Sequence, residues 1–155
     1  MKVVYARESL EKSIFLAGPT PRDTETESWR PEALKILETI GFDGKVFVPE
    51  DRNAKRSFEY DDQVQWEWSA INQATIVIFW VPREIKKMPA FVTNVEFGML
   101  ANSGKVLLGA PEEAAKMGYL KALAHRFNIP FYGTLEQLLH QAVTRAFRPY
   151  GRILP

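Results

Sequence analysis

The chain has 155 residues, of which 46% are apolar and 25% charged, with 20 basic against 19 acidic residues and no cysteine. This length predicts one domain over residues 1–155, and the near-neutral charge argues against polymeric nucleic acid or a membrane surface as partner. Because the chain has no cysteine, we expect no thiol chemistry. Because it has no long apolar run, we expect no membrane-spanning helix. We therefore expect a cytoplasmic protein with no metal and no cofactor.

The first third of the chain alternates between strand-like and helix-like patterns. Residues 13–18 form a compact apolar run that predicts a buried strand. A helix is expected from about Ser28, its predicted N-cap, to Gly41, which ends it. A second strand is predicted at 45–49, where proline stops it, and a second helix at about 61–73.

The strongest strand signal is TIVIFWV at 75–81, a continuous run of β-branched and aromatic residues typical of a strand covered on both faces. Residues 2–6 are expected to form an extra edge strand or an arm. The remaining predicted elements are a helix from about Thr93 to Ser103, a strand at 105–109, a helix at 112–127, a strand at 128–133 and a helix capped by Thr134.

This alternation predicts an α/β protein with a three-layer doubly wound flavodoxin-like fold and a five-stranded parallel sheet, in the order 2-1-3-4-5. In such sheets the ligand binds outside the carboxyl ends of the strands, near the switch between strands 1 and 3. The loops expected there are residues 17–22, 49–53, 81–91 and 109–116.

Two interpretations of Glu96 follow from its local sequence. Thr93, Asn94, Val95 and Glu96 fit a capping box, in which the glutamate stabilises the start of a helix by about 1 kcal/mol. Alternatively, a carboxylate that the helix dipole holds ionised in the crevice is suited to attack a sugar carbon. The sequence alone leaves both interpretations open.

Glu67 lies between Trp66 and Trp68, just before the central strand. If the tryptophans shield it from water, its pKa rises and it suits a general acid. It could equally be a solvated acid beside two tryptophans that pack on the sheet. His125 and His140 lie far from the predicted crevice, and we assign them no chemistry.

Candidate ligand contacts occur in the loop after the first strand. GPTPR at 18–22 lacks the glycine spacing of a dinucleotide site and the lysine of a P-loop, so neither NAD nor ATP is expected. Gly18 and Pro19 could admit a ligand to the backbone, although a plain turn is the alternative. Arg22 or Arg30 could pair with a phosphate.

Further candidates follow the second and third strands. Trp80 could stack on a planar base, and Arg83 could contact a phosphate or a base edge. Asp51 and Asn53 are either turn formers or readers of a base. Thr93 and Asn94 complete the predicted substrate contacts.

Together, several segments resemble the nucleoside 2-deoxyribosyltransferase family, in its 2-deoxyribosyltransferase-like branch. The segments that carry the resemblance are IFLAGP (14–19), VFVPEDRN (46–53), the stretch from WEW to IVIFWVP (66–82) and TNVEFGMLANSGKVLLG (93–109). The resemblance implies a flavodoxin-like fold, homo-oligomers of two or more copies and a small-molecule nucleoside or nucleotide as substrate.

The resemblance also implies roles for individual residues. Glu96 takes the place of the glutamate that attacks the anomeric carbon and forms a glycosyl-enzyme, which a second base or water then resolves. Glu67 matches the acid that protonates the leaving base, and Asn53 an amide that contacts the base. The transferases have a tyrosine at the position of Phe15 and an aspartate in the loop that here is Pro89 to Val92.

Three hypotheses follow. The leading one is an N-glycosidic transferase or hydrolase that acts on (deoxy)nucleosides or nucleotides. The alternative, prompted by the two substituted positions, is a non-catalytic nucleotide or nucleotide-signal binding module on the same fold. The third is a structural or interaction domain in which Glu96 is only a cap.

Overall fold

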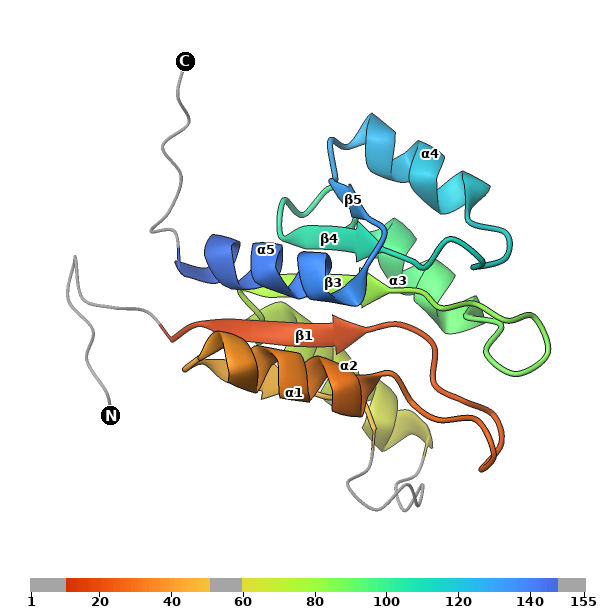
Figure 1. Cartoon of the computed structure of the whole chain (residues 1–155), viewed down its shortest axis with the longest axis horizontal. Coiled ribbons are helices and arrows are strands. Elements are labelled where there is room, and N and C mark those ends of the chain that lie inside the picture. Colours follow the sequence, from red (N-terminus) through yellow and green to blue (C-terminus); the bar gives the residue numbers. More distant parts are fainter. Residues whose placement is uncertain (1–10, 51–59, 148–155) are drawn as a thin grey trace.

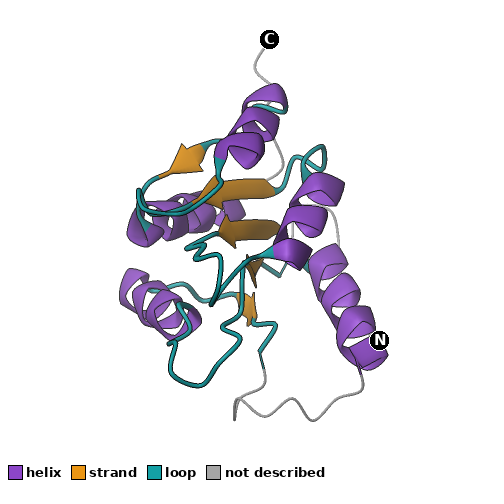
Figure 2. Cartoon of the chain, turned by 90° about the vertical axis from the view of Figure 1, so that its right-hand side faces the viewer, coloured by secondary structure: helices purple, strands orange, loops and turns teal. Residues whose placement is uncertain are grey.

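The computed structural model describes residues 11–50 and 60–147, which form a parallel sheet with helices on both faces (Figures 1 and 2). The strand order is β2-β1-β3-β4-β5, which confirms the predicted fold and order. The expected edge strand at 2–6 lies outside the described residues. The elements are β1 (Ser13–Ala17), α1 (Arg30–Ile40), β2 (Lys45–Phe47), α2 (Tyr60–Gln73), β3 (Ile76–Trp80), α3 (Phe91–Leu100), β4 (Val106–Gly109), α4 (Gly118–Arg126), β5 (Phe131–Tyr132) and α5 (Leu135–Phe147).

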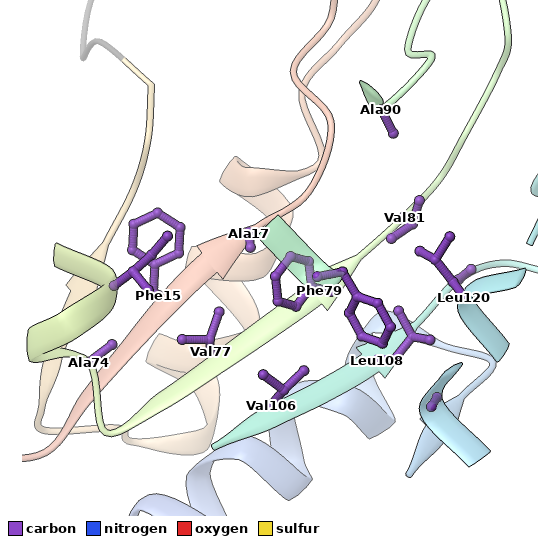
Figure 3. Packing of buried hydrophobic residues seen from close by; sticks show 14 of the residues in the cluster. Phe15, Ala17, Ala74, Val77, Phe79, Val81, Ala90, Val106, Leu108 and Leu120 are labelled. Carbon is purple, nitrogen blue, oxygen red and sulfur yellow. The ribbon is translucent and has the colours of Figure 1, made fainter. Parts of the chain in front are cut away.

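The two faces of the sheet are covered by different helices. Successive strand residues point to opposite faces, so each central strand contributes to both cores. Phe15, Val77, Phe79 and Leu108 pack with residues of α2, α3 and α4 on one face (Figure 3). On the other face, the neighbouring strand residues pack against α1 and α5. β3 is buried along its whole length, as its continuous apolar sequence predicts. No described helix is long and apolar enough to span a membrane.

Some helix boundaries differ from those predicted. α1 begins at Arg30, and its N-cap position is Trp29, so Ser28 is not the N-cap. α4 begins at Gly118 rather than residue 112, because residues 111–117 form turns, including one in which the Ala114 amide donates to the Pro111 carbonyl (3.1 Å).

Two other predicted helix boundaries are confirmed, the end of α1 and the start of α5. Gly41 ends α1 in the left-handed conformation, with φ of 77°. The Thr134 hydroxyl accepts a hydrogen bond from the Gln137 amide at the start of α5 (3.2 Å), as expected of an N-cap. Both signals are local in the sequence, which is why they could be predicted.

The loops at the carboxyl edge of the sheet are joined to one another. The Arg22 amide, after β1, donates to the Lys87 carbonyl, after β3 (3.1 Å). The Ala115 amide, after β4, donates to the Arg83 carbonyl (3.1 Å). Direct backbone hydrogen bonds therefore hold the loops after β1, β3 and β4 in fixed relative positions.

Candidate active site

Glu96 lies in the second turn of α3, not at its start. The helix begins at Phe91, and its N-cap is Ala90, which has φ of 60° and makes no side-chain capping bond. The Asn94 amide donates to the Ala90 carbonyl (3.1 Å), so the helical hydrogen bonds begin before Thr93. The predicted capping box is therefore wrong, and so is the idea that the helix terminus ionises Glu96.

The packing of α3 directs Glu96 toward the sheet-facing side of the helix. The next residue, Phe97, is buried and meets Phe79 of β3 edge-on, with 5.2 Å between ring centroids. Glu96 is half-buried beside this contact. Loss of water raises the pKa of Glu96 to about 7, and the negative charge of Glu67 adds to this effect, whereas Arg30 opposes it. A glutamate with this pKa changes its protonation state near neutral pH.

Glu67 projects from α2 toward the same region. It is half-buried, and its carboxylate accepts a hydrogen bond from the Gln63 side chain one turn earlier (2.8 Å). The neighbouring Trp66 and Trp68 are both about half exposed, at 46% and 50%. The Trp66 ring lies 6.5 Å from the Phe15 ring of β1, and Trp68 lines a groove that also contains Glu96.

Glu96 is one of the residues that line a groove between α2 and α3. Its volume is about 250 Å³, slightly below the range of about 300–1,000 Å³ usual for small-molecule sites. Its lining is mainly apolar, and Glu96 is its one ionisable residue. Glu67 is close enough to act on Glu96 by charge but does not line the groove. The lining residues are Trp68, Ile71, Asn72, Glu96, Met99 and Leu100.

Arg30 provides a buried positive charge at the end of β1. Its side chain is 1% exposed, and it forms an ion pair with Glu50 (2.5 Å). The remaining guanidinium bonds go mainly to backbone carbonyls in and just after the end of β1, including those of Leu16 (3.1 Å) and Gly18 (2.8 Å), and one goes to the Thr20 hydroxyl (3.1 Å). The suggestion that Arg30 pairs with a phosphate is therefore wrong, because its hydrogen-bonding capacity is used inside the protein.

The match with a known family agrees with this arrangement. The family model described as "Nucleoside 2-deoxyribosyltransferase like" matches residues 11–114, which include β1 to β4, Glu67 and Glu96. The chain belongs to the nucleoside 2-deoxyribosyltransferase-like family. No curated protein matches it in a sequence comparison.

Membership of the nucleoside 2-deoxyribosyltransferase-like family points to small nucleoside substrates at a general level. Not every predicted contact residue lies near Glu96, however. Trp80 is buried on the face of the sheet that α1 and α5 cover, opposite to Glu96, so its ring is not presented to the groove. Asp51 and Asn53 lie outside the described residues.

Arg83 and Asn94 bind each other. Arg83 is buried, and it donates to the Asn94 side chain and to the Lys116 carbonyl (2.8 Å). Burial lowers the pKa of the Arg83 guanidinium. Its Nε has no hydrogen-bond partner within the described structure. These contacts tie the loop after β3 to the start of α3 and to the segment before α4.

The remaining predicted contacts are occupied by the protein's own atoms. A side chain at Gly18, where φ is 147°, would place Cβ 2.1 Å from the Trp80 carbonyl oxygen. The Pro19 carbonyl accepts a hydrogen bond from the Trp29 indole (3.1 Å). Thr93 is buried in the sheet-facing side of α3. The space at Gly18 thus serves packing between strands rather than ligand access.

A larger surface depression, of about 700 Å³, lies elsewhere, along α5 and β5. This depression is remote from the carboxylates of Glu67 and Glu96, because α5 covers the opposite face of the sheet. Among residues 11–50 and 60–147, no group of three or more histidine, aspartate or glutamate side chains could hold a metal ion. The groove at Glu96 is accordingly the better candidate active site in this member of the family.

Proposed function

We propose that this protein cleaves or transfers the N-glycosidic bond of a nucleoside or nucleotide, with Glu96 as nucleophile. The observation that carries the proposal is Glu96 itself, a half-buried carboxylate with a pKa raised to about 7 that lines a groove. Family membership supports the nucleoside class of substrate. The second carboxylate, Glu67, is close enough to influence Glu96 by charge.

In the proposed reaction, ionised Glu96 attacks the anomeric carbon of the sugar. A carbon–oxygen bond forms as the carbon–nitrogen bond to the base breaks, and the base leaves with that electron pair. Glu67 delivers a proton to the leaving base. Water or a second base then attacks the same carbon, gives up its proton to Glu67 and releases Glu96 as a carboxylate. Besides the first base, the product is free sugar or a new nucleoside, or the corresponding phosphate if the substrate is a nucleotide.

A chromatographic screen for free base tests this function. Wild-type protein is incubated with a mixed pool of nucleosides and nucleotides, alongside Glu96→Gln, Glu67→Gln and the matched surface control Glu113→Gln. Base release is expected from the wild type and the control, with a loss of at least about 100-fold in Glu96→Gln. Equal activity in Glu96→Gln and wild type would exclude Glu96 as the nucleophile.

A second candidate function, binding without turnover, is favoured by Phe15. This buried apolar ring packs beside Trp66, so the site-facing side of β1 offers no polar group at this position. If the protein only binds nucleotides, calorimetry with a nucleoside and nucleotide panel will detect binding while the screen detects no free base. Absence of any binding would eliminate this alternative.

We further propose that the protein is a homo-oligomer in which a second copy covers α3. Val92, Val95 and Met99 form an uncharged stripe along this helix and are 57%, 62% and 69% exposed. A surface without charge suits contact with its own copy across a two-fold axis, because no like charges are brought together. Met99 also lines the Glu96 groove, so such a contact would enclose the site.

Light scattering after size exclusion tests this assembly. We expect at least a dimer for the wild type and a shift toward monomer for Met99→Asp at the same protein concentration. Leu34→Asp, an exposed apolar residue on α1 at the opposite face of the sheet, is the control and should keep the wild-type mass. A wild-type monomer, or an unchanged mass for Met99→Asp, would argue against this interface.

A further inference from the structure

The groove between α2 and α3 has two walls with the same helical spacing. Each wall consists of residues at positions i, i+3 and i+4 of its helix, which share one face. Those on α2 are Trp68, Ile71 and Asn72, and those on α3 are Glu96, Met99 and Leu100. Both helices follow one parallel strand and lead to another, so both run opposite to the strands and in the same direction. Trp68 and Glu96, the first residues of the two sets, therefore lie at the same end of the groove.

Trp68 gives the groove an aromatic surface that the core of the protein does not use. The side chain is half exposed, whereas Ile71 beside it is buried and adds an apolar surface to the lining. The exposed thioether of Met99 lies on the other wall. An aromatic ring and a thioether both pack favourably on the faces of a flat ring. Trp80, which was expected to stack on a base, is buried on the other face of the sheet, so this role is open to Trp68.

Asn72 gives the same wall a free amide. It follows Trp68 by about one turn, or about 5.4 Å along the helix. Its side chain is exposed, and among residues 11–50 and 60–147 no protein group forms a hydrogen bond with it. The amide of Asn94, by contrast, is occupied by Arg83. A free amide offers both a donor and an acceptor, which is what the edge of a nucleobase requires of a partner.

The charges of the lining favour a base over a phosphate. No basic residue lines the groove, and its one ionisable residue is Glu96. A phosphate placed there would meet a carboxylate without a cation to compensate either charge, which is unfavourable. A nucleobase is flat and uncharged, and its polar atoms lie at its edge. The lining therefore matches the base rather than the phosphate of a nucleotide.

We propose that this groove binds a nucleobase, with Trp68 stacked on its face and the Asn72 amide bonded to its edge. These two residues of α2 then determine which base the protein accepts. The bond from the base to the sugar lies at the end of the groove where Trp68 and Glu96 meet. The choice of a nucleobase as occupant rests on the proposed function, but binding of the base requires no turnover.

The experiment is an NMR titration of nitrogen-15-labelled protein with the free bases adenine, hypoxanthine, cytosine and thymine. Free bases have no glycosidic bond, so the protein cannot consume them. We expect at least one base to shift the Trp68 indole signal and the Asn72 side-chain amide signals. These signals are assigned by their absence in Trp68→Phe and Asn72→Leu. Ribose 5-phosphate, which has a sugar and a phosphate but no base, should shift neither.

Substitutions separate stacking from recognition of the edge. Trp68→Ala should weaken the binding of every base by at least about 5-fold, and Trp68→Phe should retain most of the affinity. Trp66→Ala is the matched control, because Trp66 is a half-exposed tryptophan of the same helix that does not line the groove, and it should leave the affinity unchanged. Asn72→Leu should instead reduce the ratio of Kd between the weakest and the tightest base by about 5-fold or more.

Three results would overturn the proposal: no base shifts the Trp68 and Asn72 signals, Trp68→Ala binds bases as the wild type does, or Trp66→Ala loses as much affinity. If no base binds and Trp68→Ala lowers the mass in light scattering, a second copy occupies the groove and the proposal also fails. Base binding without base release in the screen would reject the proposed reaction and leave this inference intact. Base release with unchanged affinity in Trp68→Ala would do the reverse.

Discussion

At the scale of the residue, environment rather than helix position determines the behaviour of Glu96. A carboxylate in the first turn of a helix gains from the dipole and ionises readily. Glu96 instead lies in the second turn, half-buried, with Glu67 nearby, and both effects raise its pKa. The positions of Phe97 and Phe79 impose this burial, because their contact presses α3 onto the sheet.

The raised pKa of Glu96 predicts a pH-dependent cost in stability. The pKa of Glu96 is 4.5 in the unfolded chain and about 7 in the folded protein. The free energy of unfolding therefore decreases as the pH rises from 4.5 to 7. Glu96→Gln should therefore be more stable than the wild type by about 1–3 kcal/mol at pH 8, with no gain at pH 4. Urea denaturation at both pH values measures the difference in unfolding free energy. A Glu96→Gln variant that is less stable than the wild type at pH 8 would contradict the prediction.

The same pKa predicts the pH dependence of the proposed reaction. A nucleophile must be ionised, so kcat/KM should rise with pH through a midpoint near 7. If Glu96 were the proton donor, the rate would fall over the same range. A pH profile of base release with the best substrate from the screen distinguishes the two assignments.

At the scale of the element, helix ends show which local signals determine structure. Thr134 was predicted as the N-cap of α5 and has that role, whereas Thr93 has a similar sequence pattern but lies buried inside α3. The difference arises because Phe91 and Val92 can extend a helix backward from Thr93, while Gly133 precedes Thr134. A capping pattern therefore marks a boundary only where the preceding residues do not continue the helix.

This difference gives a paired prediction for the two threonines. Thr134→Ala should lose about 1 kcal/mol of unfolding free energy, because the Gln137 amide loses its partner, and Thr134→Ser should retain most of it. Thr93→Ser, by contrast, should lose stability through the methyl group removed from the core rather than through a cap. Chemical denaturation of the three variants measures these effects, and an unchanged Thr134→Ala would refute the cap.

At the scale of the whole molecule, Gly18 couples β1, β3 and α1. The space that a side chain would need is filled by the Trp80 carbonyl and, at 3.0 Å, by the Trp29 ring. These contacts bring the end of β1 to its position beside Arg30. The glycine is therefore a packing requirement between elements that are distant in the sequence.

Gly18→Ala should consequently cost several kcal/mol, because the backbone carbonyl it meets cannot move without shifting β3. Gly104→Ala is the matched control, since it also has a positive φ, of 75°, but nothing lies within 4 Å of the added carbon. The control should lose only about 1 kcal/mol of conformational energy. Thermal unfolding compares them, and equal losses would show that packing at Gly18 does not matter.

The sequence by itself determined the fold, its strand order and the family, because alternating apolar runs and turn residues act locally and their order leaves few topologies. It also singled out Glu96 and Glu67. Only the tertiary structure decided that Glu96 is shielded mid-helix, that Trp80 faces away and that Arg30 is held by Glu50 and backbone carbonyls. These outcomes depend on contacts between distant segments, where burial and charge are set by neighbours that no local pattern specifies.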